Sequence, residues 1–224
     1  MNVAAEVWLA LGTSTIYEAS KLPCALDPRL RPAWSGAEAC APAYPVGCLP
    51  GDNLALHTAV ELAPAGSILV VDGGGLLVGY WGEVLTRAAQ RQGIAGLVID
   101  GGVRDIDSLE MLGFPVFARG VSMLGTYKAG VGTLGGPTDV GGVVVAAGDL
   151  VVADRDGVIC LPRADVGRVL VEAKARQVKE AAMIEAIRAG AHTLDLYGWR
   201  QLLTETEQES TDLVSGETSD QGAP

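Results

Sequence analysis

Residues 96–109, GLVIDGGVRDIDSL, place an arginine and an aspartate after an apolar strand that runs into two glycines. A guanidinium group presents a planar fork of donors to a carboxylate or an oxyanion. An aspartate supplies the kind of oxygen ligand that a hard divalent cation prefers. Arg104 and Asp105 together therefore predict a site that binds an anion and a divalent cation.

A second predicted strand, SILVVDGGG at residues 67–75, reaches glycines in the same way. Ligands settle at strand ends in α/β sheets, where glycine permits close approach to the backbone. The next helix opens at Gly82 and Glu83, and free N–H groups between Gly82 and Leu85 favour a carboxylate. The alternative interpretation is an ordinary surface turn, in which Asp105 caps the helix that follows it.

For the other polar residues, a structural role is preferred to a role in binding or catalysis. Asp52 and Asn53 are predicted to cap the helix that they precede, although the backbone amides there can also face the site. His57 is interpreted as a structural residue of that helix rather than a metal ligand. His192 is interpreted as a solvated cap near a helix end. Lys128, in TYKAG, has no predicted role beyond a surface charge.

Around these residues the pattern predicts an α/β domain of buried strands and amphipathic helices. Helices are expected over 2–12, 13–20, 52–63, 83–92, 105–112 and 164–190, and strands over 67–75, 96–102, 114–120 and parts of 140–162. Thr13 or Ser14 is the predicted N-cap of the second helix, and residues 21–45 are expected to form a proline-punctuated connection. One domain is expected over residues 1–204, followed by an acidic, disordered tail over 205–224.

Composition and charge limit the classes of function. Of the 224 residues, 49% are apolar and 5% aromatic, and the 30 glycines suit short strands joined by tight turns. The net charge is −11, and residues 205–224 contain acids without a lysine or an arginine. Because nonspecific nucleic-acid binding relies on basic patches, no nucleic-acid partner is expected.

The cysteines and the N-terminus indicate the compartment. Cys24, Cys40, Cys48 and Cys160 form no C-x-x-C pair and are expected to be reduced thiols. The N-terminus lacks the basic and apolar regions of a signal peptide. No apolar run approaches the roughly 20 residues that span a bilayer. We therefore expect a cytoplasmic protein without membrane contact.

The spacing from Glu83 to Arg104 and Asp105, an acid followed by twenty residues and then arginine and aspartate, resembles a known signature. It is that of the class II pyruvate aldolases that cleave 4-hydroxy-4-methyl-2-oxoglutarate and 4-carboxy-4-hydroxy-2-oxoadipate, in the family related to the ribonuclease-activity regulator RraA. The resemblance covers roughly residues 5–203 and includes TSTIYEASKLPCALDPRLRP, PGDNLALH, SILVVDGGG, WGEVLTRAAQRQGIAGLVIDGGVRD, LGFPVFARG, GDLVVADRDGV and LDLYGWR. The first segment looks like the start of the carboxy-hydroxy-oxoadipate branch.

The resemblance implies a four-layered αββα sandwich related to the phosphohistidine-domain fold. It also implies a homo-oligomer, a trimer or a hexamer of two trimers, with active sites between subunits. Glu18 matches a carboxylate that the neighbouring subunit contributes to the site, and Glu180 matches a second.

Residue roles follow from the same resemblance. Asp105 would hold Mg²⁺ or Mn²⁺, partly through waters, and Arg104 would bind the 2-oxo acid substrate and stabilise its enolate. Glu83 would hold the water that shuttles the proton. The substrate-binding turn would consist of Gly82, Glu83, Val84 and Leu85.

The implied reaction breaks the C3–C4 bond of a 4-hydroxy-2-oxo acid and releases pyruvate and a second oxo acid. Oxaloacetate decarboxylation passes through the same enolate and is expected as a side activity. Whether C4 carries a methyl or a carboxymethyl group stays open. The segments DVGGVVV and GGGLLVGYWG depart from the pattern of the family. An enzyme of the same fold that acts on a different, biosynthetic substrate therefore stays an open alternative. A non-catalytic regulator like RraA is the other alternative, which Asp105 disfavours because that branch typically loses this acid.

Overall fold

The computed structural model describes residues 3–203 of the chain, and the predicted tail over 205–224 lies outside them. The chain divides into two compact units, Met1–Arg176 and Gln177–Pro224, and each is described by itself. The expectation of one domain over residues 1–204 stays a prediction.

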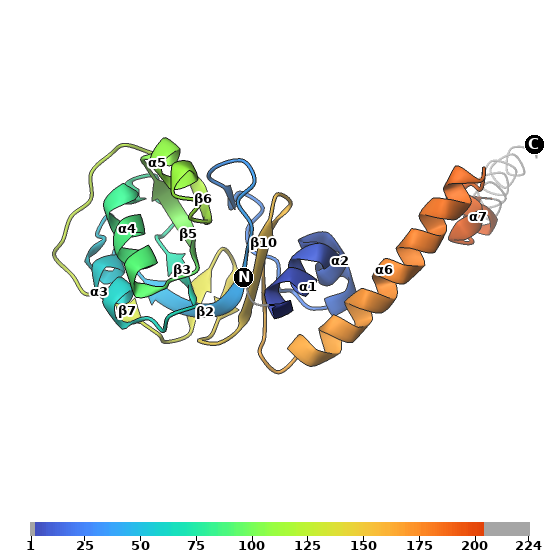
Figure 1. Cartoon of the computed structure of the whole chain (residues 1–224), viewed down its shortest axis with the longest axis horizontal. Helices are drawn as coiled ribbons and strands as arrows, with labels where there is room; N and C mark the ends of the chain where they lie inside the picture. The colour runs from blue at the N-terminus through green and yellow to red at the C-terminus, as the bar shows by residue number, and fades with distance from the viewer. Residues whose placement is uncertain (1–2, 204–224) are drawn as a thin grey trace, which may run out of the picture. The chain divides into compact units, whose positions relative to one another are not determined.

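The first unit contains helices and short strands in alternation (Figure 1). Its helices are α1 (Val3–Leu11), α2 (Thr13–Ser20), α3 (Leu54–Leu62), α4 (Glu83–Gln92) and α5 (Ile106–Met111), and α6 (Val166–Arg188) begins in it. Its strands are β1 (Arg31–Pro32), β2 (Ala39–Gly47), β3 (Ile68–Asp72), β4 (Gly79–Trp81), β5 (Gly96–Val103), β6 (Val116–Val121), β7 (Thr133–Leu134), β8 (Thr138–Val140), β9 (Val143–Val145), β10 (Leu150–Asp154) and β11 (Gly157–Leu161).

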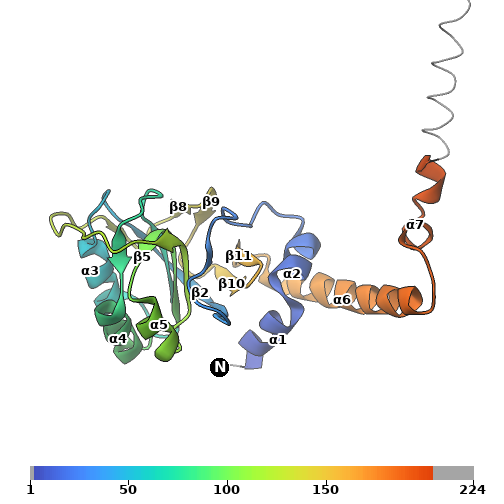
Figure 2. The ribbon, with the colours of Figure 1, turned by 90° about the horizontal axis from the view of Figure 1, so that it is seen from above.

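The main sheet is mixed and nearly closed on itself. Its strand order is β1-β6-β5-β3-β2-β10-β11, with β4 paired to β5 and β7 to β2. β6, β5, β3 and β2 run parallel, whereas β2, β10 and β11 pair antiparallel. β2 joins the two halves, and Figure 2 shows β10 and β11 between β2 and helix α2.

Side chains of the strands alternate between two apolar clusters, as the two-residue period of a strand requires. In β3, Leu69 and Val71 pack with residues of α3, α4 and α5, whereas Ile68 and Val70 pack inside the curled sheet. The inner cluster also includes residues of β10 and β11: Val151, Ala153, Val158 and Cys160. The sheet therefore encloses one core and carries a second on its outer face.

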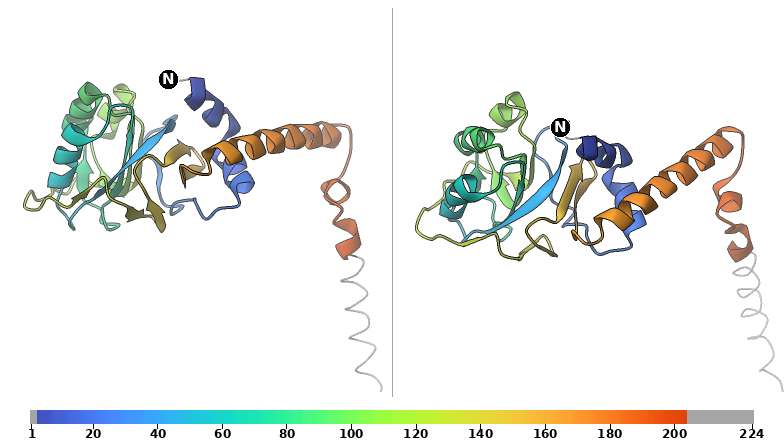
Figure 3. Two further views of the ribbon diagram at one scale, coloured as in Figure 1. Left: turned by 90° about the horizontal axis from the view of Figure 1, so that it is seen from below. Right: turned by 60° about the horizontal axis from the view of Figure 1, so that its bottom comes forward.

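A third apolar cluster covers the outer side of β10 and β11. Ile159 and Leu161 pack there with Trp8 of α1, Ile16 of α2 and Val169 at the start of α6. Helices α3–α5 and α1–α2 thus lie on opposite sides of the strands, as Figures 1 and 3 show. The two halves of the curled main sheet face each other across the inner cluster, and helices cover each half. The order of layers is helix, sheet, sheet, helix, which confirms the predicted αββα sandwich.

Two local predictions for residues 13–45 were wrong. The predicted connection over 21–45 contains most of β2, a central strand that the sequence hides because it is built from alanines and prolines. β10 pairing ends at Pro42 and β3 pairing begins at Ala43, so the strand changes partner beside a residue that lacks an N–H. Thr13 does not cap α2 but is its first residue, and its N–H and hydroxyl both donate to Asp154.

The second unit is described over residues 177–203. It holds the end of α6 and a short α7 (Thr193–Leu196), which His192 precedes as an exposed N-cap position without a side-chain capping bond. Tyr197 and Trp199 stack with their ring centroids 4.3 Å apart.

Across the described residues, no helix is long and apolar enough to cross a membrane. All four cysteines are free thiols, as predicted.

Candidate functional site

A short strand brings the two predicted site segments together. β4, which the sequence did not predict, pairs with the end of β5 through Gly79 and Trp81. The Arg104 N–H donates to the Trp81 carbonyl oxygen over 2.9 Å. A Cβ atom at Gly82 would overlap the Asp105 carboxylate and lie 3.1 Å from Arg104 Cγ. A side chain at position 82 would therefore force the Asp105 carboxylate to move, because the side chains of Arg104 and Asp105 pack directly against Gly82.

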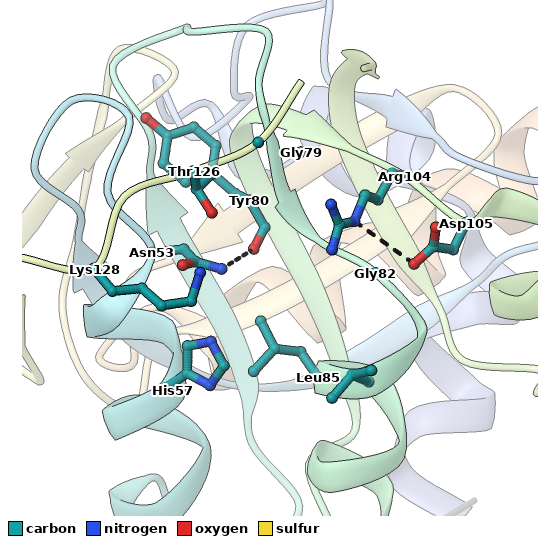
Figure 4. Close-up of a pocket in the computed structure, with 12 residues that line it drawn as sticks. Asn53, His57, Gly79, Tyr80, Gly82, Leu85, Arg104, Asp105, Thr126 and Lys128 are labelled. Atoms are coloured by element: carbon teal, nitrogen blue, oxygen red, sulfur yellow. Dashed lines mark hydrogen bonds and ion pairs between the residues drawn. The ribbon is translucent and has the colours of Figure 1, made fainter. Parts of the chain in front are cut away.

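A cavity of about 300 Å³ opens at this junction. Figure 4 shows its labelled residues, with Arg104 and Asp105 on one side and Lys128, Asn53 and His57 on the other. Leu85 of α4 lies between the two groups in that view. The complete lining consists of Asn53, His57, Gly79, Tyr80, Gly82, Val84, Leu85, Arg104, Asp105, Gly125, Thr126 and Lys128.

Asp105 occupies an unusual backbone conformation. Its φ is 61°, which places this non-glycine residue in the left-handed region. Its side chain does not cap α5, so the expectation that Asp105 caps the helix that follows it is wrong. Oδ2 instead accepts the Glu83 N–H, the first of α4, over 3.0 Å. Within residues 3–203, Oδ1 accepts no hydrogen bond, and 41% of the side chain is exposed.

Arg104 presents its guanidinium group to the cavity. Its closest anionic partner is the neighbouring Asp105, with Nε 3.7 Å from Oδ2. That distance is longer than a hydrogen bond, and the described residues offer the guanidinium no other ion pair. The fork of donors is therefore available to a ligand.

The first turn of α4 supplies further donors. The Glu83 N–H is taken by Asp105, and Thr86 N–H donates to the Gly82 carbonyl oxygen over 3.1 Å. For the N–H groups of Val84 and Leu85, no acceptor is present within the described residues, and both residues line the cavity. Free N–H groups at a helix N-terminus attract anions.

Glu83 itself points into a neighbouring hollow rather than into this cavity. It lines that hollow with Arg104, Asp105 and Ser108. Its Oε1 accepts from Arg87 Nε over 2.8 Å, and its Oε2 accepts from the Ser108 hydroxyl over 2.9 Å. The hydrogen bond from Arg87, and next that from Ser108, hold the pKa of Glu83 below its usual value. Glu83 is therefore a carboxylate at neutral pH.

The donor set suits a cation that retains most of its water. Across residues 3–203, no three His, Cys, Asp or Glu side chains are grouped so that they could hold a metal ion. Mg²⁺ commonly binds through one or two carboxylates and keeps several waters. Asp105, with one open carboxylate oxygen beside the cavity, fits that mode.

The structure also places the other polar residues of the sequence. Asp52 Oδ1 accepts the Leu54 N–H over 2.8 Å, while Asn53 is the N-cap position of α3 without a side-chain capping bond. Asn53, His57 and Lys128 all line the cavity. Burial, and then the nearby charge of Lys128, lower the pKa of His57 below 6.5. The sequence assigned Lys128 no role, although Thr126 and Lys128 share the two-residue spacing of an extended segment.

Two predicted carboxylates lie outside the cavity. Glu18, on α2, pairs with Arg176 over 3.1 Å, and its side chain is 55% exposed. Glu180, on the part of α6 in the second unit, is half-buried. Neither residue lines the cavity, and the expectation that a neighbouring subunit brings them there stays a prediction.

Comparisons with known proteins give consistent matches. The family model described as Aldolase/RraA, RraA-like, matches residues 13–160. A Halalkalibacterium halodurans protein named "Putative 4-hydroxy-4-methyl-2-oxoglutarate aldolase" is 34% identical over 173 residues, 77% of this chain and 82% of that protein. An "uncharacterized protein" from Pseudomonas syringae pv. tomato superposes with a TM-score of 0.76 at 27% identity, over 88% of this chain and 94% of that one. The RNA-processing inhibitor RraA from Thermus thermophilis superposes with a TM-score of 0.57 at 32% identity, over 62% of this chain and 84% of that one.

Proposed function

The chain belongs to the RraA-like family, and from that premise we propose that it is a divalent-cation-dependent aldolase. The proposed reaction cleaves a 4-hydroxy-2-oxo acid into pyruvate and a second oxo acid. 4-Hydroxy-4-methyl-2-oxoglutarate and 4-carboxy-4-hydroxy-2-oxoadipate are the candidate substrates, and oxaloacetate decarboxylation is the expected side activity.

The observation that carries the proposal is the convergence of three kinds of group on one cavity. Arg104 contributes an available guanidinium, Asp105 an open carboxylate oxygen, and α4 two backbone N–H groups at Val84 and Leu85. A 2-oxo acid carries a carboxylate and a keto oxygen side by side. The donors suit the carboxylate, and the charge that develops on the keto oxygen can be met by the guanidinium.

Asp105 would hold Mg²⁺ or Mn²⁺, and the described residues supply no other carboxylate to the cavity lining. When bound, the cation supplies positive charge near the oxygens of the keto acid. Its presence would also explain why a site for anionic substrates contains a carboxylate.

The chain's own residues then act as follows. Arg104 and the first turn of α4 bind and orient the 2-oxo acid. The proton leaves the C4 hydroxyl, the C3–C4 bond breaks, and C4 becomes the carbonyl carbon of the second oxo acid. The electron pair moves to the pyruvate half as an enolate, whose negative oxygen Arg104 stabilises. Protonation at C3 completes pyruvate.

Glu83 contributes to the proton transfer by orienting water. Its pKa is held low by Arg87 and Ser108, so the carboxylate itself is a weak base at neutral pH. Fixed by both partners, it offers a rigid acceptor in the hollow that Arg104 and Asp105 also line. A water held there is the proposed carrier of the proton.

The test is a direct assay with a substrate panel. Purified chain is incubated with each candidate substrate and with oxaloacetate, with Mg²⁺ or with EDTA, and pyruvate is measured through a coupled dehydrogenase. Cation-dependent pyruvate release is expected from at least one branched 4-hydroxy-2-oxo acid. Absence of pyruvate from the whole panel, with a folded chain and with either cation, would rule the proposal out.

The similarity to an RNA-processing inhibitor supports a second candidate, a non-catalytic regulator of ribonuclease activity. Such a regulator has no need of an open carboxylate beside an available guanidinium. Inhibition of RNA cleavage that persists in Asp105→Asn, in a chain without lyase activity, would favour this candidate instead.

We also propose a homo-oligomer, a trimer or a hexamer, in which Glu18 and Glu180 of a neighbouring chain approach the site. Light scattering of the full chain measures the mass of the assembly. A monomer that retains full turnover would exclude this part of the proposal.

A further inference from the structure

The cavity has a second polar end, which the proposed reaction leaves unused. Asn53 and His57 come from α3, and Thr126 and Lys128 come from the segment after β6. Figure 4 shows these residues across the cavity from Arg104 and Asp105. Resting on the proposed function, we propose that Lys128 forms a second anion subsite, beside the open Asn53 Oδ1, which is placed to accept a ligand hydroxyl. The subsite binds the carboxylate at the C4 end and so selects oxo acids that carry a carboxylate at both ends.

Lys128 brings a positive charge to the cavity without a carboxylate in direct contact among the described residues. Within residues 3–203 it forms no ion pair, whereas four arginines of the first unit, Arg29, Arg87, Arg119 and Arg168, each pair with a carboxylate. Its charge contributes to lowering the pKa values of both His57 and Asp52. An ammonium group in that position is available to a ligand carboxylate.

The backbone on both sides of Lys128 is fixed to the start of α3. Tyr127 N–H donates to the Gly51 carbonyl oxygen over 2.8 Å, and Asn53 N–H donates to the Tyr127 carbonyl oxygen over 3.1 Å. Asp52 Oδ2 accepts the N–H groups of Ala129 and of Gly130, the latter over 3.0 Å. Lys128 therefore differs from a lysine on a free surface loop, because both adjoining residues are held in place.

Asn53 provides an unused acceptor at the same end. Its side chain is nearly buried, with 6% of the residue exposed. Nδ2 donates to the Tyr80 carbonyl oxygen over 2.9 Å, which fixes the orientation of the amide. Oδ1 is buried and has no hydrogen-bond partner. A buried acceptor without a donor is unfavourable, and a ligand hydroxyl or the Lys128 ammonium would satisfy it.

The apolar side chain of Leu85 separates the two polar ends of the cavity. Leu85 lies between Arg104 and Lys128 in Figure 4, and the two cations project from opposite sides. A ligand with one carboxylate satisfies only one of these cations. A ligand with carboxylates at both ends of a short carbon chain can satisfy both and leave its middle on Leu85.

Two unreactive ligands test this selection. 2-Oxoglutarate has both carboxylates but no C4 hydroxyl, so it cannot be cleaved, and 2-oxopentanoate replaces its far carboxylate by a methyl group. We expect calorimetric titration with Mg²⁺ present to show at least tenfold tighter binding of 2-oxoglutarate. In Lys128→Met the ratio of the two dissociation constants should fall to less than threefold.

Matched variants complete the test. Lys174→Met removes an exposed lysine of α6 that does not line the cavity, and it should keep the wild-type ratio. Lys128→Arg keeps the charge and should retain most of the preference. A ratio in Lys128→Met equal to that of the wild type would overturn the subsite.

Failure of the subsite and failure of the proposed function give different results. Exchange of the pyruvate methyl protons in D₂O with Mg²⁺ reports enolate formation without any C4 end. If the wild type shows no exchange, the aldolase proposal fails, and the titrations still decide the subsite. If exchange occurs but Lys128→Met leaves the ligand preference intact, the aldolase proposal stands and the subsite is wrong.

Discussion

Asp105 Oδ2 accepts the backbone N–H of Glu83 over 3.0 Å, so the aspartate that precedes α5 binds the first residue of α4. The hydrogen bond joins two segments that are 22 residues apart in the chain. It orients the carboxylate toward the cavity and leaves Oδ1 open among the described residues. Asp105 therefore combines a structural contact with the proposed cation ligand, and the two can be separated experimentally.

Asp105→Asn should remove the charge and keep the structural contact. An asparagine carbonyl oxygen can accept the same N–H, and asparagine tolerates the left-handed backbone. We expect the loss of turnover and of cation-dependent pyruvate exchange, with thermal stability close to that of the wild type. Asp105→Ala should lose activity as well and also about 1 kcal/mol of stability, as for a lost helix cap. Full turnover in Asp105→Asn would contradict the role in cation binding.

Arg104→Ala should lower kcat strongly, because the developing oxyanion loses its guanidinium. Removing one such donor typically costs about 10²–10³-fold in kcat. Arg104→Lys keeps the charge but loses the planar fork, and we expect it to lose at least about tenfold in kcat/KM. Steady-state kinetics measure both variants, and full activity in Arg104→Lys would exclude a forked contact with the substrate.

Gly82→Ala should displace the Asp105 carboxylate. The new methyl group would overlap that carboxylate and lie 3.1 Å from Arg104 Cγ, although φ at Gly82 is −165° and places no strain on alanine. We expect kcat/KM to fall at least about tenfold through misplacement of the site. Gly136→Ala is the control, because its Cβ would meet nothing within 4 Å. Equal effects of the two substitutions would show that the close approach is unimportant.

Arg87→Met should change the acid side of the pH profile. The hydrogen bond from Arg87 lowers the pKa of Glu83 below 4.5, so its removal raises that pKa toward 4.5. Since Glu83 must be ionised to hold the water, kcat/KM should begin to fall at a higher pH than in the wild type. Arg91→Met, on the same helix without a bond to Glu83, should leave the profile in place. An unshifted profile in Arg87→Met would separate Glu83 from proton transfer.

His57 should report the charge of Lys128 directly. Burial and the Lys128 charge lower its pKa below 6.5, so we expect neutral His57 at pH 7, with protonation only as the pH falls further. The chain has two histidines, so an NMR titration resolves both, and His192→Gln assigns them. Lys128→Met should raise the pKa of His57 toward 6.5. A His57 pKa at or above 6.5 in the wild type would contradict the packing of this end of the cavity.

Buried strands and helix ends were readable from the sequence because they depend on local pattern. Leu69 and Val71 against Ile68 and Val70 follow the two-residue period, and Gly93 ends α4 in the left-handed conformation. The pairing of Arg87 with Glu83 also follows from their four-residue separation on one helix.

The parts that were missed depend on contacts between distant segments. Alanines and prolines conceal β2, whose place in the sheet comes from β3 and β10 on either side. Lys128 reaches the cavity because Asp52 holds the residues that follow it, 77 and 78 positions along the chain. No local spacing encodes that contact, so the place of Lys128 in the cavity could not be predicted.

The left-handed conformation of Asp105 also bears on how the family can diverge. Asparagine and glycine adopt this conformation at least as readily as aspartate, so the backbone does not require the acid. A gene that encodes this architecture can therefore discard the charge in one step and keep every layer of the fold. Substitution at position 105 by either residue would thus remove the proposed cation ligand at no cost in backbone conformation.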